Sequence, residues 1–358
     1  MKQLVLILSV CLFSFLSQAN DQVILGKGTN LAHYISQTSR TGEDRRNFLS
    51  EKDIAYIASL GFDHVRLPID EKQMWFEDGQ KDAVAFQLMH NVIKWSLHHD
   101  LKVVIDLHIL RSHHFNAKKK PLWTDLNEQE KFINLWRDLS EELKSYPTDK
   151  LVYELMNEPV ADDPEDWNKL VQKVFSEIRS LEADRWIVIG SNRWQSADTF
   201  DELKIPNDRK IILSYHFYEP FLLSHYKTPW TFLKPYDGPV NYPGPILKKK
   251  DFNALPSEQQ GIVKDYVGKK FDKKTLLKMM EKPLAKAKKL GLPLYCGEYG
   301  VFFTVSEKDR LAWYKDMMEI FREHHISSAN WNYKSKAFGF VDDQGKPIPA
   351  MRDVLLEK

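Results

Sequence analysis

The amino-acid sequence predicts an α/β protein built as a single (β/α)8 TIM barrel, a closed ring of parallel strands surrounded by helices. Eight short apolar runs of strand length recur along the chain, and stretches with helical spacing of apolar residues separate most of them. This alternation indicates a parallel sheet, and eight units in 358 residues fit a closed barrel better than an open sheet. Because no linker or internal repeat interrupts the chain, we predict one barrel domain over residues 20–358.

The expected elements follow in order along the chain. The predicted strands cover residues 23–30, 64–69, 101–108, 151–159, 185–192, 211–218, 294–300 and 328–333. The predicted helices cover residues 49–60, 83–99, 129–143, 167–181, 276–290 and 308–324, with a closing helix from residue 351. Gly61 and Gly291 follow two of these helices, where glycine commonly ends a helix.

The N-terminus has the pattern of a signal peptide. Lys2 precedes an apolar run over residues 4–16, and Ser17 and Ala19 place small residues before a cleavage site. We therefore predict a signal peptide over residues 1–19 and a secreted or periplasmic protein, without membrane insertion. After cleavage Cys296 is the remaining cysteine, so no internal disulfide is expected, and its apolar neighbours predict a buried thiol.

Composition limits the partners. Lys and Arg number 51 against 50 Asp and Glu, for a formal net charge of +1, so no basic field favours nucleic acid. We expect a monomer. Residues 219–274, after the sixth predicted strand, form a long connection rich in aromatic residues, Pro and Gly. We interpret it as an ordered lid beside a site, with disorder as the alternative.

Two predicted strands end in a glutamate. The run LVYELMNEP delivers Asn157 and Glu158, and the run LYCGEYG delivers Glu298. In a parallel barrel the carboxyl ends of the strands hold the chemistry. One such glutamate alone is more simply an ordinary strand end, but two are the minimum equipment for hydrolysing a glycosidic bond.

Other strand ends carry groups that suit a sugar site: Arg66, His108, His216, Tyr218 and Trp331. Arginine can orient a carboxylate through its planar fork, the histidines and the tyrosine can exchange hydrogen bonds, and an indole face can support a sugar ring. Each residue alone has a structural explanation, such as an ion pair or a core side chain. Their coincidence at one edge of one barrel favours a site.

Rival chemistries find less support. The sequence has no G-x-S-x-G elbow for a serine hydrolase. The pairs at 98–99, 113–114 and 324–325 lack the H-E-x-x-H spacing of a zinc enzyme, so no metal or cofactor is predicted. The pair at 113–114, on an insert over residues 109–125, is expected either to line the cleft or to lie on a surface loop. A non-catalytic carbohydrate-binding barrel stays open, although such a protein would be expected to have lost a glutamate.

The ordered motifs H-V-R-L-P, D-L-H, L-M-N-E-P, H-F-Y, G-E-Y-G and N-W resemble glycoside hydrolase family 5, the cellulase family of the Asn-Glu-Pro barrel clan. The resemblance covers nearly the whole chain after the signal peptide. It implies that Glu158 is the acid/base, Glu298 the nucleophile, and Asn157 the contact to the sugar 2-hydroxyl. The remaining implied subsite residues are Arg66, His108, His216, Tyr218 and Trp331.

The resemblance implies a retaining hydrolase of β-linked polysaccharide, and the H-F-Y-E-P and aromatic-loop regions favour an endo-β-1,4-glucanase. A β-mannanase, a β-1,3-glucanase or a mixed-linkage glucanase stays open. We expect Arg66 and Tyr218 to lower the pKa of Glu298, and the charge of Glu298 to raise the pKa of Glu158. Stacking platforms are expected from Trp331 and some of Trp194, Trp230 and Tyr236.

Overall fold

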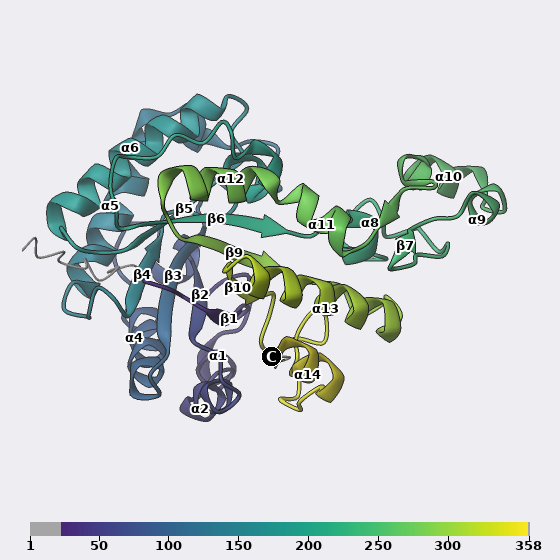
Figure 1. The fold of residues 1–358 in the computed structure, drawn as a ribbon. Helices are drawn as coiled ribbons and strands as arrows, with labels where there is room; N and C mark the ends of the chain where they lie inside the picture. The colour runs from purple at the N-terminus through teal and green to yellow at the C-terminus, as the bar shows by residue number, and fades with distance from the viewer. Residues whose placement is uncertain (1–22, 357–358) are drawn as a thin grey trace, which may run out of the picture.

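The computed structural model describes residues 23–356 and contains the expected barrel, with eight parallel strands and helices around them (Figure 1). The strands close in the order β1-β10-β9-β6-β5-β4-β3-β2. They are β1 (Lys27–Asn30), β2 (His64–Asp70), β3 (Lys102–Ile109), β4 (Leu151–Glu154), β5 (Ile187–Gly190), β6 (Ile211–Phe217), β9 (Leu294–Tyr299) and β10 (Ser327–Asn330). The predicted signal peptide lies outside the described residues.

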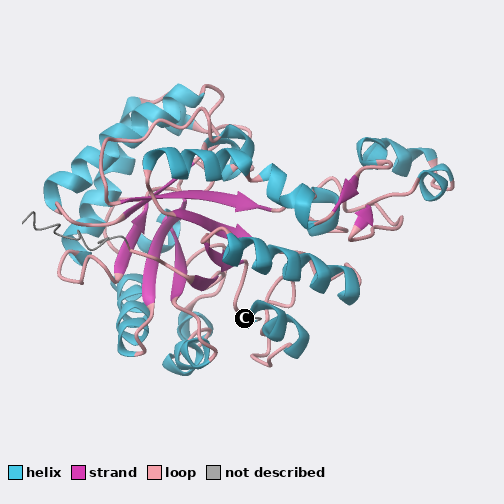
Figure 2. Ribbon diagram, in the orientation of Figure 1, coloured by secondary structure: helices cyan, strands magenta, loops and turns pink. Residues whose placement is uncertain are grey.

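The helices form an outer layer around the strands, as the cyan ribbons of Figure 2 show. The helices that follow the barrel strands are α2 (Glu51–Ser59), α4 (Ala83–His98), α5 (Leu126–Leu143), α6 (Pro164–Leu181), α11 (Lys273–Met279), α12 (Glu281–Leu290), α13 (Glu307–Glu323) and α14 (Pro349–Leu356). Shorter helical segments are α1 (Gly42–Arg46), α3 (Glu71–Met74), η1 (Pro121–Trp123), α7 (Asn192–Gln195) and η2 (Ala197–Thr199). The helix expected over residues 276–290 is two helices, which divide at Met280.

One strand is shorter than expected. β4 ends at Glu154, so Asn157 and Glu158 lie in the loop after the strand and not at its tip. The expectation that Pro159 ends the strand was wrong, because the chain leaves regular pairing with β5 after Glu154 and Glu158 adopts a left-handed backbone with φ of 45°. The amide N–H of Asn157 still donates to the Leu107 carbonyl at 3.1 Å, which holds the loop against β3.

The interior of the barrel is arranged in layers along its axis. Successive side chains of a strand alternate between the two faces of the sheet, so Val104, Asp106 and His108 of β3 share the inner face. Val104 belongs to a buried apolar cluster at the amino-terminal end of the strands, together with Val152 and Tyr295. An ionic layer with Asp106 follows, and His108 lies at the carboxyl-terminal end. The apolar layer therefore lies at the amino-terminal end of the strands, the charged layer lies next to it, and the site lies at the carboxyl-terminal end.

The long connection after β6 is ordered. It contains α8 (Phe221–Ser224), β7 (Gly244–Pro245), α9 (Lys249–Asn253), α10 (Ser257–Val263), η3 (Lys264–Tyr266) and β8 (Lys270–Phe271). The part with β7, α9 and α10 extends beyond the carboxyl ends of β6 and β9 and away from the barrel (Figure 1). Its start approaches the site, since the rings of His225 and Tyr218 lie 5.1 Å apart. The insertion is therefore ordered, as expected, and lies beside the barrel mouth as a side lobe.

Two further expectations concern single features. Cys296 is a free, buried thiol in the core, as its apolar neighbours predicted. Over residues 23–356, none of the helices combines the length and the apolar character that crossing a membrane requires.

Candidate active site

Glu298 is held from two sides. At the end of β9 its Oε1 accepts a hydrogen bond from Arg66 Nη1 at 2.8 Å, and its Oε2 accepts one from the Tyr218 hydroxyl at 3.0 Å. Burial raises the pKa of Glu298, and the charge of Arg66 and the hydrogen bond from Tyr218 oppose that rise. The expected lowering by Arg66 and Tyr218 is present, but the net direction is upward because burial of the carboxyl group outweighs it.

Glu158 faces Glu298 from the loop after β4. Its Oε1 lies 3.1 Å from His216 Nδ1, and that nitrogen is 3.7 Å from Glu298 Oε2. One oxygen of each carboxylate and the imidazole nitrogen all lie within 4.8 Å of one another. Burial, followed by the charge of Glu298, raises the pKa of Glu158 well above its usual range. The two glutamates thus differ: Glu298 has a direct cationic partner, and Glu158 has none among residues 23–356.

Arg66 organises the ionic layer beneath the two glutamates. Its side chain is fully buried, and it pairs with Glu154 at 2.7 Å, Asp106 at 2.9 Å and Glu298 at 2.8 Å. It also donates to Asn157 Oδ1 at 2.9 Å, which fixes the orientation of that amide. Sequence reasoning had not assigned a role to Glu154 or Asp106. The period of two along β3 and β4 could have placed both carboxylates inside the barrel.

His108 and Trp331 form one edge of the site. Their rings stack with centroids 5.6 Å apart and planes 7° apart. His108 Nδ1 lies 2.6 Å from Asp106 Oδ2, and burial lowers the pKa of His108 to about 4, so the neutral imidazole donates to that carboxylate. Trp331 keeps 9% of its surface exposed, and Asn157 Nδ2 is buried without a hydrogen-bond partner in the described chain. Both groups therefore stay available for further contacts at this edge of the site.

The aromatic residues expected to form platforms divide into two groups. Trp194 and Trp230 are 44% and 56% exposed, so their faces are available. Tyr236 is fully buried and donates to the Pro239 carbonyl at 2.8 Å. Tyr236 is therefore not one of the platforms, because it forms part of the insertion's own core, and Trp194 and Trp230 stay as the candidates.

Aromatic residues that sequence reasoning missed lie beside Trp331. Phe302 and Phe338 share a buried cluster with it, and Trp230 packs edge-on against Phe302 with centroids 5.4 Å apart. Both residues follow strand ends, Phe302 after β9 and Phe338 after β10. Their position in loops without periodicity gave the sequence no means of finding them.

His113 has neither of the two expected placements. It is buried, and its Nε2 accepts a hydrogen bond from the Val160 N–H at 3.2 Å, two residues after Glu158. It therefore supports the loop that carries Glu158. His114, the second member of the pair, stacks on Phe115 with centroids 4.6 Å apart.

A cavity of about 1490 Å³ lies at the opposite end of the barrel. Its lining includes Gly26, Lys210, Pro293 and Ser327, which precede or begin strands, and none of the residues predicted for the site. In barrels of this architecture the reacting groups lie at the carboxyl ends of the strands. The convergence of charged groups, and not cavity volume, therefore locates the candidate site.

Comparison with known proteins agrees with this geometry. The family model for cellulase, glycosyl hydrolase family 5, matches residues 26–337. Endoglucanase C of Acetivibrio thermocellus is 31% identical over 328 residues, which cover 90% of this chain and 94% of that protein. Cellodextrinase A of Ruminococcus flavefaciens is 32% identical over 305 residues, covering 84% and 83%.

Among solved structures, Thermotoga maritima Cel5A in complex with mannotriose has a TM-score of 0.74 at 23% identity, covering 93% of this chain and 98% of that one. That likeness concerns the fold. The family model matches residues 26–337, which include both glutamates and every residue predicted for the site, and the two sequence relatives each cover most of the chain. The chain therefore belongs to the cellulase family, glycosyl hydrolase family 5.

Proposed function

We propose that this glycoside hydrolase is an endo-β-1,4-glucanase that cleaves its substrate with net retention, using Glu298 as nucleophile and Glu158 as acid/base. The observation that carries the proposal is the pair itself. Two buried glutamates face each other, one bound to a guanidinium and a phenol and the other to an imidazole. A carbohydrate-binding barrel without activity has no need of two carboxyl groups in such different environments.

The first step uses the difference between the two groups. Glu298, ionised beside Arg66, attacks the anomeric carbon, while protonated Glu158 gives its proton to the departing glycosidic oxygen. A glycosyl ester of Glu298 forms and the C–O bond to the leaving sugar breaks. Asn157, whose Oδ1 is already taken by Arg66, has its N–H groups free for the sugar 2-hydroxyl.

The second step reverses the roles. Esterification removes the charge of Glu298, which is one of the causes that raise the pKa of Glu158. Glu158 is then a stronger acid and stays ionised, so it can take a proton from the incoming water. The water oxygen bonds to the anomeric carbon, the ester breaks, and both glutamates return to their starting states.

The separation of the carboxylates supports retention. Oxygens of Glu158 and Glu298 lie within 4.8 Å of each other. Retaining glycosidases hold their carboxyl groups about 5–5.5 Å apart, whereas inverting enzymes need about 6.5–9.5 Å to admit a water. The anomeric form of the first product, followed by proton NMR, tests this point. From a β-linked substrate we expect the β-anomer first, and an initial α-anomer would refute the double displacement.

The substrate assignment rests on the relatives, which are named endoglucanase and cellodextrinase. Its test is a panel of carboxymethylcellulose, mixed-linkage β-glucan, mannan, xyloglucan and laminarin. We expect the highest kcat/KM on carboxymethylcellulose or mixed-linkage glucan, with a rapid fall in viscosity from internal cleavage. A higher kcat/KM on mannan or laminarin would contradict the assignment of β-1,4-glucan as substrate, but not the proposed mechanism.

Variants of the glutamates test the chemistry. Glu158→Gln and Glu298→Gln should each lower kcat by at least about 10²-fold. Glu165→Gln is the matched control, because Glu165 lies in the first turn of α6 and pairs with Lys204 outside the site, so this variant should keep wild-type activity. A purified wild-type protein that binds β-glucan but hydrolyses no member of the panel would support the carbohydrate-binding alternative.

We also propose that residues 1–19 are removed on export, that the mature catalytic domain begins at residue 20, and that it acts as a monomer outside the cytoplasm. Ser17 and Ala19 at the cleavage positions support the first point. N-terminal sequencing of the exported protein should begin at Asn20. Light scattering should give the mass of one chain, and a dimer mass would contradict the monomer.

A further inference from the structure

Gln195 contacts the backbone of Glu158 from beneath. It lies in the short segment after β5 and is fully buried. Its side-chain Oε1 accepts a hydrogen bond from the Glu158 N–H at 2.9 Å, and its Nε2 donates to Glu154 Oε1 at 3.2 Å and to Ser214 Oγ at 3.1 Å. One amide therefore joins the loop of Glu158 to the ionic layer and to β6.

The backbone that delivers Gln195 is unusual. Arg193, Trp194 and Gln195 all have positive φ, at 54°, 61° and 52°, although none of them is glycine. Consecutive left-handed residues with side chains are unfavourable, so the surrounding structure must hold them in place. Glu158 itself has φ of 45°. Left-handed backbone thus occurs at both ends of the Gln195–Glu158 hydrogen bond.

The space around the Gln195 side chain depends on a neighbouring glycine. A Cβ atom at Gly190 would lie 2.4 Å from Gln195 Nε2, so a larger residue there would displace the side chain. The Trp194 N–H donates to the Pro159 carbonyl at 3.3 Å, so the same left-handed segment holds the chain on the other side of Glu158. The catalytic carboxyl group is therefore carried on a backbone fixed before and after it by one segment.

We propose that Gln195 is a positioning residue that holds Glu158 in its left-handed conformation and so aims its carboxyl group at the glycosidic oxygen. This inference rests on the proposed role of Glu158 as acid/base. Without the Gln195 acceptor, the Glu158 N–H would be buried and unpaired, and the backbone would turn to find another partner. Acid catalysis would weaken, while Glu298 would keep its contacts with Arg66 and Tyr218.

The test compares leaving groups. Gln195→Met keeps the side-chain volume but removes the acceptor, and Gln195→Asn keeps an amide that is too short to reach. We expect kcat/KM on cello-oligosaccharides to fall by about 10- to 100-fold, part of the usual contribution of general acid catalysis. The leaving group of 2,4-dinitrophenyl cellobioside needs no proton. On this substrate we therefore expect kcat/KM to fall by less than about threefold. If Gln195→Met does not fold, the same comparison of the two substrates is made with Gln195→Asn.

Asn192→Leu is the matched control. Asn192 is a buried amide of the same segment, but it binds the N–H and the carbonyl of Ala161, beyond Glu158. We expect Asn192→Leu to lower the melting temperature and to leave the dependence of kcat/KM on the leaving group unchanged. Wild-type dependence in both Gln195 variants would overturn the inference. If Glu158→Ala also left that dependence unchanged, the proposed function of Glu158 would fail instead, so the two failures are distinguishable.

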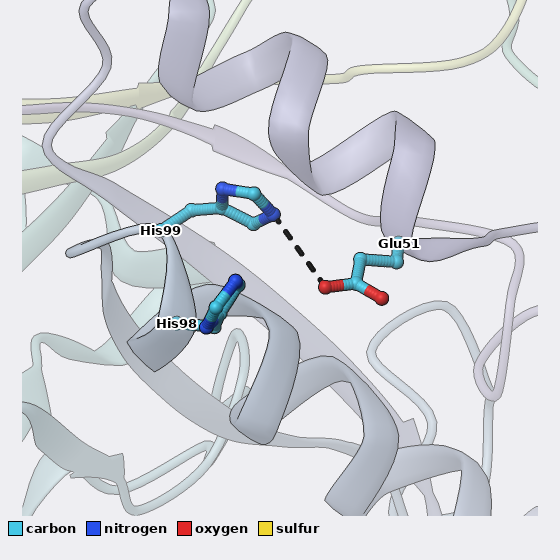
Figure 3. A group of neighbouring side chains, drawn as sticks. All are labelled: Glu51, His98 and His99. Carbon is cyan, nitrogen blue, oxygen red and sulfur yellow. Dashed lines mark ion pairs between the residues drawn. The ribbon is translucent and has the colours of Figure 1, made fainter.

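A second, independent cluster lies at the surface between α2 and α4. Glu51, His98 and His99 face one another there, as Figure 3 shows. Single ligand atoms from the three side chains lie within 4.8 Å of one another, and His99 Nε2 is 3.7 Å from Glu51 Oε1. That nitrogen is shielded from solvent and lacks a hydrogen-bond partner among residues 23–356.

We infer that this cluster binds a divalent late transition ion such as Zn²⁺. Zinc binds imidazole nitrogen and carboxylate oxygen at about 2.0–2.2 Å, so neighbouring ligands of a tetrahedral site lie about 3.3–3.5 Å apart. The 3.7 Å between His99 Nε2 and Glu51 Oε1 is close to this ligand–ligand distance. The side chain of His98 is more exposed, so it can move the short distance that is still needed. Two imidazoles and a carboxylate favour zinc over calcium or magnesium, with water as the fourth ligand. The ion would link the first turn of α2 to the last turn of α4.

The test uses tag-free protein freed of metal by a chelator. Calorimetry with ZnCl₂ should show one more binding event in the wild type than in His98→Gln/His99→Gln, and zinc should raise only the wild-type melting temperature. His324→Gln/His325→Gln is the control, since that adjacent pair also ends a helix, α13, but is not grouped with an acidic side chain in the described chain. Equal stoichiometry in all three proteins would overturn the inference.

Discussion

Replacing Arg66 by lysine separates its charge from its geometry. All five guanidinium N–H groups donate: two to Glu154 and one each to Asn30, Glu298 and Asn157. A lysine offers three donors at one nitrogen, so at least two of these bonds are lost. Buried hydrogen bonds to charged groups contribute about 1.5–3 kcal/mol each, so the free energy of unfolding should fall by roughly 3–6 kcal/mol.

Activity should change in a defined direction. Arg66 lowers the pKa of Glu298 against the effect of burial, so a weaker contact lets that pKa rise. The nucleophile is active only when ionised, and it is lost as pH falls through its pKa. The acidic limb of the kcat/KM profile should therefore move to higher pH in Arg66→Lys. Urea unfolding and a pH–rate profile on soluble β-glucan measure the two effects.

Arg185→Lys is the matched control. Arg185 is also fully buried, and its guanidinium donates to Glu182 and to the carbonyls of Leu143, Tyr146, Pro147 and Leu151, away from the site. It should lose comparable stability and keep the wild-type pH profile. If Arg66→Lys also kept that profile, Arg66 would be a structural residue only. If Arg66→Lys unfolded at wild-type urea concentrations, the donor count would not describe its energetics.

Three further predictions follow from burial. Trp331→Ala should lower kcat. Trp230 has a more exposed ring, so Trp230→Ala should mainly raise KM for long substrates. Unchanged kinetics in Trp331→Ala would show that Trp331 is not part of the site. Tyr236→Ala should lower the melting temperature by several degrees without raising KM, because its ring is buried; a higher KM at wild-type stability would restore it as a platform. Burial lowers the pKa of His64 to about 3, so below about pH 6.5 the unfolded chain binds a proton that the folded chain does not bind. This one residue should therefore lower the free energy of unfolding by roughly 2–3 kcal/mol between pH 7 and 4.5. His64→Gln should flatten that part of the urea-midpoint profile, and an unchanged slope would contradict the assignment.

Local patterns were sufficient for the barrel. Most of the barrel strands are apolar runs bounded by turn residues, β1 (KGTN) and β10 (SSAN) being the exceptions. Each main helix repeats apolar residues at helical spacing, so most elements can be recognised without knowledge of their partners. The alternation of the two then restricts the topology to parallel pairing. Strand ends were less certain, and β4 shows why: whether the chain continues in the ladder after Glu154 depends on hydrogen bonds to β5 and not on the nearest proline.

The site was predictable to the extent that its residues stand at strand ends. Glu298 and His108 lie near the carboxyl ends of β9 and β3, where the closed barrel brings them together, whereas Arg66 lies in the middle of β2 and reaches Glu298 from the layer beneath. Residue types at those positions therefore indicated their chemistry. The net direction of the pKa of Glu298 was not predictable, because burial depends on everything packed around the carboxyl group.

By itself, then, the sequence determined which residue types the strands and the loops after them bring to the site. The alternation of strands and helices along the chain is a local pattern, and closure of the barrel places the carboxyl ends of the strands at one edge. The tertiary structure alone decided which buried groups meet across the barrel. Gln195 reaches Glu158, and Arg66 binds Glu154, through contacts between segments separated by 37 and 88 residues. Such contacts depend on backbone geometry and on the space left by neighbours such as Gly190, neither of which leaves a periodic trace in the sequence.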